Sequence, residues 1–233
     1  MISIIIPTLN EEENLPNLFY YIKNSIGCDI PYEVIICDGG SQDRSVLIAK
    51  KNKAKVIHSN KKNRAFQMNL GAQNSSGELL YFLHADTLPP KSFGQTIQFY
   101  FQNNLTSGCF RLSFDNSHWL LSLSSWATRF NLKYFQFGDQ SLFISKTLFE
   151  QIGGYNIDLQ IMEDVDIINR IRKKSKFIIA PDKVISSARR YLYYGVIKTE
   201  LTHLLILLMY MVGCNQQLLL STYSKLIPSK KSF

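Results

Sequence analysis

Carboxylates follow two short apolar runs of the kind that form buried strands. Asp38 follows residues 33–37 and precedes Gly39, and Asp86 follows residues 79–83. At a strand end, the Asp38 carboxylate can accept a hydrogen bond from a nucleobase ring N–H, while glycine allows a tight backbone turn. The Asp86 carboxylate can hold a divalent cation that bridges two phosphates. Each position also fits a plain structural role, as a turn or a helix cap.

His84 stands two residues before Asp86 and is a second candidate metal ligand. A neutral imidazole is an acceptable ligand for Mn2+ and a poorer one for Mg2+. A single histidine is also common in structural positions, so both interpretations stay open.

A second acidic pair, Glu163 and Asp164, begins a segment with helical spacing at 162–173. Carboxylates at a helix start are stabilised by the helix dipole whatever their function, and spacing alone favours this electrostatic role. Asp164 can act as a general base only where it points into a cleft beside an acceptor hydroxyl. Asp166 and Arg170 lie four residues apart and are expected to form a surface ion pair.

Three arginines are candidates for contacting diphosphate, because a guanidinium donates in parallel to two phosphate oxygens. Arg64 precedes an amphipathic segment, and Arg189 and Arg190 follow a strand-like run. Each arginine also fits a solvated surface position.

Short apolar runs alternate with amphipathic segments through the first half of the chain. This alternation predicts an α/β fold whose strands form a parallel sheet covered on both faces. In such a sheet the ligand site lies beyond the carboxyl ends of the strands, so the loops after the runs are expected to meet at one edge. The expected strands are Ile2–Ile6, Glu33–Cys37, Ala54–His58 and Leu79–Leu83, and the expected helices are 11–26, 43–51 and 65–74.

Composition narrows the class of partner. The 233-residue chain has a net charge of +8, which favours an anionic partner such as a phosphorylated small molecule or an acidic membrane surface. Its basic residues are scattered, and no run is long enough for a nucleic-acid-binding arm, so we expect no nucleic-acid partner. The four cysteines lack metal or redox spacing and the first residues do not resemble a signal peptide, which together predict a cytoplasmic location.

Six motifs occur in order along the chain: IIIPTLNEE at 4–12, CDGGSQD at 37–43, Asn69 with Gly71, FLHAD at 82–86, GDQ at 138–140 and MEDVD at 162–166. Together they resemble the family 2 glycosyltransferases, which have the GT-A fold, over about residues 1–190. The resemblance is closest to the subgroup called rSAM/selenodomain-associated transferase 2, through RAFQMN at 64–69, FLHADT at 82–87 and ARRY at 188–191. No GxGxxG follows the first strand and no GxxxxGK loop occurs, which argues against a dinucleotide oxidoreductase or a nucleotidyltransferase.

The resemblance implies a GT-A type, mostly parallel Rossmann-like sheet and a metal-dependent, inverting transfer of one sugar from a nucleotide-sugar donor to an acceptor hydroxyl. Asp164 would be the catalytic base, Asp86 would hold Mn2+ or Mg2+ at the diphosphate, and Asp38 would contact the nucleobase. His84 stands in place of the first aspartate of the family's DxD motif and is a second candidate ligand. The QxxRW motif of processive synthases is absent, which favours single addition.

The same resemblance assigns residues to two parts of the site, and a non-catalytic nucleotide-sugar-binding protein is the alternative function. The nucleotide would be contacted by Pro7, Thr8, Asn10, Glu11, Asp38, Gly39, Arg64, Asn69 and Asp86. The acceptor or cleft would be lined by Asp139, Gln140, Glu163, Arg189 and Arg190.

Residues 1–190 are expected to form the catalytic domain, with a nucleotide-binding half at 1–104 and an acceptor half at 105–190. A helical extension is expected at 191–233, with an apolar stripe within 191–213. The stripe is too short to span a membrane, so we expect it to pack against the catalytic domain or a second copy of the chain. The alternative is a peripheral contact at the inner face of a membrane, which would suit a lipid-linked acceptor. The stripe consists of Leu201, Leu204, Leu205, Leu208, Met209 and Val212.

Overall fold

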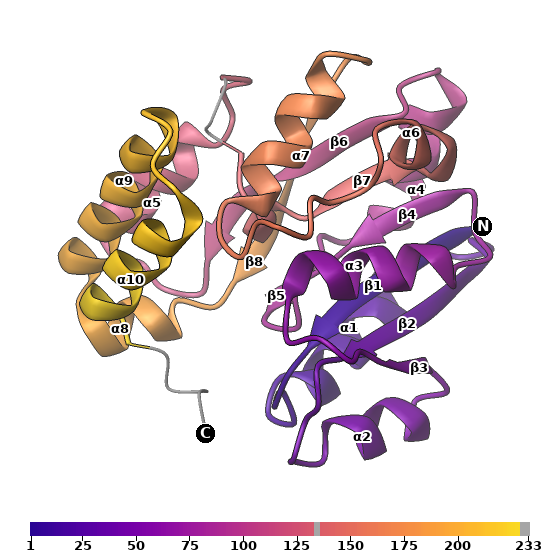
Figure 1. Ribbon diagram of the computed structural model, residues 1–233. Helices are drawn as coiled ribbons and strands as arrows, with labels where there is room; N and C mark the ends of the chain where they lie inside the picture. Colours follow the sequence, from indigo (N-terminus) through magenta and orange to yellow (C-terminus); the bar gives the residue numbers. More distant parts are fainter. Residues whose placement is uncertain (133–135, 229–233) are drawn as a thin grey trace.

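The computed structural model describes residues 1–132 and 136–228, and the described strands form one eight-stranded sheet (Figure 1). The strands are β1 (Ile2–Thr8), β2 (Tyr32–Asp38), β3 (Lys55–His58), β4 (Leu79–Phe82), β5 (Thr87–Leu88), β6 (Ser107–Phe114), β7 (Leu142–Ser145) and β8 (Ile178–Ser186). Their order across the sheet is β3-β2-β1-β4-β7-β6-β8-β5. Both halves of the chain therefore contribute to one continuous sheet.

The four strands of the first half run parallel, as the sequence predicts. β1 pairs with β2 and β4, and β2 pairs with β3. The register aligns Thr8 with Asp38 and Asp38 with His58, so these strand ends meet at one edge. Central parallel strands are covered on both faces and need successive apolar residues, and residues 4–6 are all fully buried.

The second half departs from the predicted, mostly parallel arrangement, and the sheet as a whole is mixed. β7 runs antiparallel to both β4 and β6, and β5 runs antiparallel to β8, whereas β6 and β8 are parallel. A strand with both faces covered is apolar at successive positions in either direction, so an apolar run carries no information about strand direction. Direction is set instead by the path of the chain between strands.

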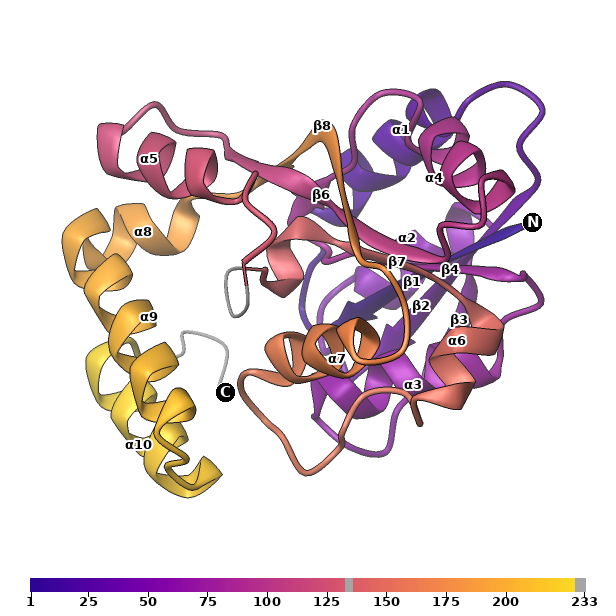
Figure 2. The ribbon, with the colours of Figure 1, turned by 90° about the horizontal axis from the view of Figure 1, so that it is seen from above.

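Helices cover both faces of the sheet (Figure 2). They are α1 (Leu15–Ser25), α2 (Ser45–Lys51), α3 (Arg64–Gln73), α4 (Phe93–Gln102), α6 (Lys146–Gln151) and α7 (Glu163–Arg172). α1 and α4 pack on one face, and α3, α6 and α7 pack on the other. Ile4 and Ile6 of β1 join the first core and Ile5 joins the second, because successive residues of a strand point to opposite faces.

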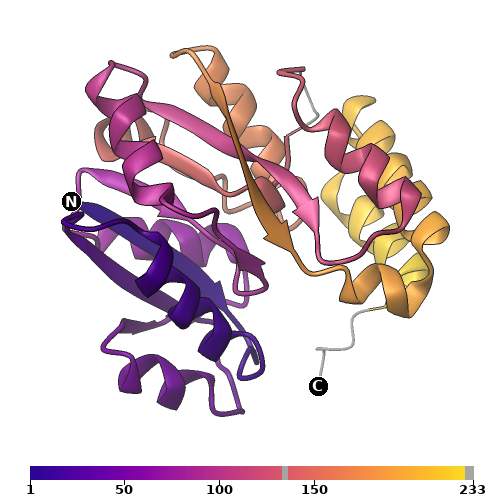
Figure 3. The same ribbon diagram turned by 180° about the vertical axis from the view of Figure 1, so that it is seen from behind.

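Four further helices form a group beside the sheet (Figures 1 and 3). They are α5 (Trp119–Ala127), α8 (Arg189–Tyr194), α9 (Val196–Met211) and α10 (Gln216–Leu226). The apolar segment expected at 191–213 is broken at Gly195, whose φ of 89° lies in the left-handed region that favours glycine. Within residues 1–132 and 136–228, no helix is long and apolar enough to cross a membrane.

The prediction that the apolar stripe packs against the catalytic domain is wrong. Leu201 and Leu208 of α9 are 60% and 50% exposed, whereas Thr199, Thr202 and Ile206 are buried. Each threonine hydroxyl donates to a backbone carbonyl one turn earlier, which satisfies this polar group in its buried position. Helical spacing identifies a stripe, but it does not determine the side toward which the rest of the protein lies.

Candidate functional site

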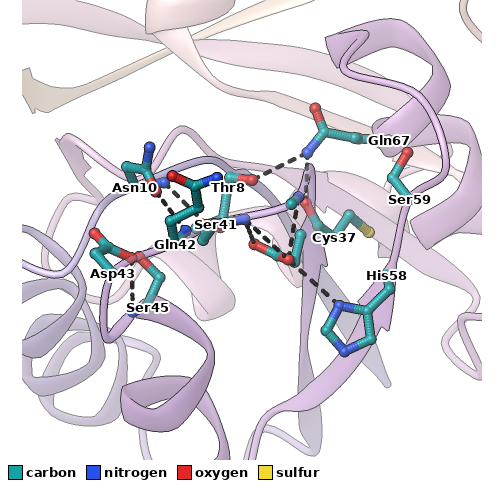
Figure 4. A network of polar contacts seen from close by, with 12 residues as sticks. Thr8, Asn10, Cys37, Ser41, Gln42, Asp43, Ser45, His58, Ser59 and Gln67 are labelled. Atoms are coloured by element: carbon teal, nitrogen blue, oxygen red, sulfur yellow. Dashed lines mark hydrogen bonds and ion pairs between the residues drawn. The ribbon is translucent and has the colours of Figure 1, made fainter. Parts of the chain in front are cut away.

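Asp38 ends β2, and its side chain is almost fully buried. Its carboxylate accepts backbone N–H bonds from Gly40 at 3.2 Å and Ser41 at 3.1 Å, which hold the following loop in a tight turn. His58, at the end of β3, places Nδ1 3.3 Å from the same carboxylate (Figure 4). Asp38 therefore shapes the loop, and the sequence analysis missed its histidine partner.

A buried amide that the sequence analysis also missed ties the end of β1 to the end of β2. Gln67 of α3 donates from Nε2 to the carbonyl of Cys37 at 2.6 Å and to that of Thr8 at 3.1 Å (Figure 4). Gly39 N–H also donates to the Thr8 carbonyl, at 2.8 Å. The Thr8 hydroxyl is buried and donates to Ile6, so Thr8 contributes its backbone to this site and its side chain does not line a nucleotide pocket. The available signal was a glutamine among the apolar residues of the α3 sequence.

The loops that follow β1 and β2 bind each other through paired polar contacts (Figure 4). Asn10 N–H donates to Ser41 Oγ at 2.9 Å, and Gln42 N–H donates to Asn10 Oδ1 at 2.8 Å. Glu11 N–H donates to Ser45 Oγ at 2.8 Å. Asn10 has a φ of 53°, a left-handed conformation that asparagine tolerates better than most residues. The two loops expected to contact nucleotide therefore form one connected rim.

Asp43 joins this rim to the start of α2. Its Oδ1 accepts from Ser45 N–H at 2.9 Å, and its Oδ2 accepts from Glu12 N–H at 3.0 Å. The residue in the N-cap position is Arg44, so Asp43 acts one residue before the position of a standard cap. Pro7 is the partly buried residue before the end of β1.

Asp86 follows β4 and lies beside an arginine from much later in the sequence. Arg189 Nη2 donates to Asp86 Oδ2 at 2.9 Å and lies 3.3 Å from Glu11 Oε2. Burial lowers the pKa of Arg189, but the charges of Asp86 and Glu11 outweigh it and raise the pKa above its ordinary value. The structure thus brings three predicted site residues together, with a cationic group between two carboxylates.

His84 and Asp139 form a second pair in the site, with 3.3 Å between His84 Nδ1 and Asp139 Oδ1. Burial lowers the pKa of His84, but the hydrogen bond with Asp139 outweighs it and raises the pKa above its ordinary value. Burial raises the pKa of Asp139, but the pairing with His84 and the charge of Arg64 outweigh it and lower the pKa to about 2. A metal ion on His84 would have to use Nε2, with Asp139 orienting the ring.

Glu163 and Asp164 occupy the first turn of α7. Glu163, which was expected to line the cleft, is buried and accepts from Arg64 Nη1 at 3.2 Å. Burial and the charge of Asp164 raise the pKa of Glu163 to about 7. Burial also raises the pKa of Asp164, against the positive charges of His84 and Arg64. Carboxyl groups with raised pKa values are suited to proton transfer near neutral pH.

Arg64 lies among four carboxylates of the predicted site. Burial lowers its pKa, but their combined charge raises it above the ordinary arginine value, and the guanidinium stays cationic. In order of decreasing effect, these residues are Glu163, Asp164, Asp139 and Asp86. Side chains from β4, the GDQ motif, α3 and α7 are therefore close enough to interact electrostatically, which the sequence order alone does not reveal.

Gly138 of the GDQ motif lies against the side chain of Asp164. A Cβ atom at position 138 would overlap the Asp164 carboxylate and lie 2.9 Å from His84 Cε1. A hydrogen bond from the Gly138 backbone to Asp164 acts to lower the pKa of that carboxyl group. Glycine is therefore needed here for close approach, and this role was not predicted.

Gly138→Ala is expected to reduce the rate of the reaction by about one to two orders of magnitude, because the methyl group displaces Asp164 from its position. The fold should persist, which a melting temperature close to that of the unaltered protein would confirm. In a double variant with Asp164→Asn, the rate should fall no further than with Asp164→Asn alone, because Gly138 acts through Asp164. Additive losses in the double variant would contradict this role.

Two predicted site residues have structural roles instead. Both ends of the Asn69 amide bond the backbone of Tyr155, at 2.8 Å each, so Asn69 fastens the turn at 153–155 and is not free for a nucleotide. Gln140 is completely buried and donates to the carbonyl of Phe110 at 3.0 Å, so it lies in the core and not in the cleft. A motif position can be required for the shape of the site without contacting a ligand.

Arg190 points toward the last helix, where its Nη1 donates to Tyr223 Oη of α10 at 2.9 Å. Adjacent arginines at the start of α8 therefore contact different parts of the protein. Arg189 reaches the carboxylates of the site, and Arg190 holds the C-terminal helices. The expected contact of Arg190 with the cleft is replaced by this link.

The chemistry of the donor set at Asp86 fits a divalent cation bound together with a diphosphate. Within 1–132 and 136–228, no group of three or more His, Cys, Asp or Glu side chains is arranged to hold a metal ion. A cation at Asp86 would therefore take most of its ligands from diphosphate oxygens and water. The Asp86 side chain is 26% exposed and already pairs with the guanidinium of Arg189, so positive charge is accommodated there.

The fold and this loop edge define a GT-A-like α/β protein with its polar groups beyond the carboxyl ends of the parallel strands. The mannosyltransferase PcManGT from Pyrobaculum calidifontis, solved with GDP-Man and Mn2+, has a TM-score of 0.71 and 15% identity to this chain, covering 95% of it and 69% of the mannosyltransferase. Residues 3–153 match Glycosyl transferase family 2. The chain belongs to this family.

Curated relatives match a short segment of the chain. Glycosyltransferase AglE of Haloferax volcanii is 32% identical over 94 residues, which are 38% of this chain and 31% of AglE. Dolichol-phosphate mannosyltransferase of Pyrococcus furiosus is 34% identical over 94 residues, which are 38% of this chain and 26% of the relative. The match therefore spans less than a third of the length of either relative.

Proposed function

We propose that this protein transfers one sugar from a nucleotide-sugar donor to an acceptor hydroxyl, with inversion at the anomeric carbon. The observation that carries this proposal is the position of Asp164, a carboxyl group with a raised pKa that lies against Gly138 and within electrostatic range of Arg64 and Asp86. Membership of family 2 supports a glycosyltransferase, and the likeness to PcManGT supports the fold on which it would act.

The donor would bind along the rim formed by the loops after β1 and β2. In this proposal the base lies near Asp38 and Gly39, and Pro7, Asn10 and Glu11 line the pocket. The contacts that Asp38 already makes support its role, because they hold its carboxylate in one orientation. His58 is added to the set, since its ring contacts the same carboxylate from β3.

The diphosphate would lie between Asp86 and the two arginines Arg64 and Arg189. Mn2+ or Mg2+ held by Asp86, with His84 as a second candidate ligand, would supply positive charge that stabilises the departing diphosphate. Arg189 now donates to Asp86, so its guanidinium is within reach of phosphate oxygens bound at the same place.

Asp164 would take the proton of the acceptor hydroxyl as the oxygen attacks the anomeric carbon from the face opposite the diphosphate. The bond from carbon to diphosphate breaks as the new glycosidic bond forms, and no covalent intermediate forms on the enzyme. Glu163 would act indirectly, because it holds Arg64 and its negative charge raises the pKa of its neighbour.

The finer assignments rest on the motifs. The ordered set from RAFQMN to ARRY supports the rSAM/selenodomain-associated transferase 2 subgroup, single addition, and a catalytic domain at 1–190 followed by a helical extension. The name of the Pyrococcus furiosus relative supports a lipid-linked acceptor. A cytoplasmic location, inferred from the cysteine spacing, is part of the same proposal.

A thermal-shift panel of GDP- and UDP-sugars with and without Mn2+ tests donor binding, because a ligand that binds the folded state raises the melting temperature. The donor found in this way is then incubated with polyprenyl phosphate, and release of the nucleoside diphosphate is measured by chromatography. We expect Mn2+-dependent release. Binding without release under any acceptor would favour the alternative, a non-catalytic nucleotide-sugar-binding protein.

The value of kcat/KM is expected to rise with pH as the Glu163–Asp164 pair loses its proton. Burial raises the pKa of both groups, so the base is protonated and inactive below the raised pKa and active above it. Glu163→Gln removes a neighbouring negative charge and should move the inflection to lower pH. An inflection at the ordinary carboxyl pKa, or one that Glu163→Gln leaves in place, would contradict a base at Asp164.

A further inference from the structure

One face of α9 is apolar and exposed along its length. Ile197, Leu201, Leu204 and Leu208 recur at intervals of three and four residues, and each is at least half exposed. Val212, just after the helix, is 79% exposed. Burial of this face in the protein is excluded, because α9 already packs through its opposite side on α8 and α10.

α5 adds aromatic residues beside this face. Trp119, Leu123 and Trp126 recur at intervals of four and three residues and are 67%, 53% and 49% exposed. α5 and α9 contact each other, and Ser124 of α5 donates to Glu200 of α9 at 3.0 Å. Glu200 lies at the edge of the apolar face of α9, next to Leu201 in sequence, so the exposed residues of the two helices flank one line of contact. We call these exposed residues of α5 and α9 the apolar surface.

The charged residues around the apolar surface have one sign. Residues 116–132 and 189–228 contain a single carboxylate, Glu200, and Ser124 donates to it. The same segments contain five basic residues, of which Arg129 stacks on Trp126 with 5.1 Å between guanidinium and ring centre. The other four are Arg189, Arg190, Lys198 and Lys225.

We propose that the apolar surface binds the interface of a bilayer that contains anionic lipids. Amphipathic helices bury an apolar face at the boundary of headgroups and acyl chains, and tryptophan is favoured at this depth. Basic residues beside the face add attraction to anionic headgroups. A second copy of the chain fits less well, because two surfaces rimmed by positive charge would repel each other. This inference concerns a surface outside the catalytic residues and holds whether or not sugar transfer occurs.

Both tryptophans of the chain lie on the apolar surface, so their fluorescence reports binding directly. Vesicles of phosphatidylcholine with phosphatidylglycerol should shift the emission of Trp119 and Trp126 to shorter wavelength and carry the protein upward in a flotation gradient. The triple variant Leu201→Asn/Leu204→Asn/Leu208→Asn should weaken binding by about a hundredfold or more. Its melting temperature should stay close to that of the unaltered protein, because these side chains are exposed.

A matched control replaces three exposed apolar residues elsewhere, Tyr20→Asn, Leu47→Asn and Phe99→Asn, which are 67%, 66% and 60% exposed. This control should float like the unaltered protein. Absence of flotation, equal loss in the control, or equal flotation with phosphatidylcholine alone would overturn the proposal. A dimer in light scattering that the α9 triple variant converts to monomer, with no vesicle binding by either protein, would assign the surface to a second copy instead.

Discussion

Asp164→Asn is expected to reduce kcat by about two to four orders of magnitude and to leave donor affinity unchanged. The amide has the shape of the carboxylate but cannot take the proton of the acceptor hydroxyl. Asp164 lies in the first turn of α7, against Gly138, where the backbone fixes its orientation. The measurement is steady-state turnover of the identified donor, together with its dissociation constant by calorimetry.

Asp166→Asn is the matched control, because Asp166 is on the same turn of the same helix. Its carboxylate pairs with Arg170 at 2.8 Å, the ion pair that the sequence predicted. This variant loses an exposed pair of small energetic value, so kcat should stay within about twofold. If Asp164→Asn retains the full kcat, or if both variants lose it equally, Asp164 is no more than a helix-start charge.

Asp86→Asn is expected to abolish the dependence of donor binding on Mn2+ and to weaken donor affinity at saturating Mn2+ by roughly a hundredfold or more. The carboxylate is the group that a divalent cation needs, and the amide that replaces it is a weaker oxygen ligand without charge. The measurement is donor affinity by calorimetry across a titration of Mn2+, with the melting temperature as the check on folding.

The Asp86 variant also breaks the pair with Arg189, so a second variant separates the two effects. Arg189→Gln removes the same pair but keeps the carboxylate, and it should retain the Mn2+ dependence while it weakens donor binding. If Arg189→Gln alone abolishes the Mn2+ dependence, or if Asp86→Asn retains it, the metal does not bind at Asp86.

These two expected results distinguish binding from chemistry. Asp86→Asn acts on the bound diphosphate and appears in donor affinity, whereas Asp164→Asn acts on the proton and appears in kcat alone. A protein that only binds nucleotide sugars would respond to the first variant and would show no turnover for the second to reduce. The pair of variants therefore also tests the proposed function as a whole.

Local sequence patterns were sufficient for much of the first half of the chain. The runs at 2–6, 33–37 and 79–83 each form a buried strand, and their order along the chain placed Asp38 and Asp86 after strand ends. This worked because a strand covered on both faces must be apolar at successive positions, and because parallel strands end at the same edge. The Asp166–Arg170 pair was equally local, since both residues lie on one helix face.

Tertiary structure decided what depends on contacts between distant segments. Apolar runs are the same in either strand direction, so only the path of the chain shows that β7 runs antiparallel between β4 and β6. The roles of Gly138 and Gln67 come from partners 26 to 59 residues away, the Asp164 carboxylate and the carbonyl of Thr8. No spacing rule encodes such distances.

The C-terminal helices show the same division between local pattern and tertiary contact. The sequence by itself determined that α9 has an apolar stripe, because helical periodicity is a local property. Only the structure determined that this stripe faces outward, since Thr199 and Thr202 satisfy their hydroxyls within the helix and can be buried against the protein. The side of a helix that is buried is set by the partners it meets after folding, and those partners lie far away in the sequence.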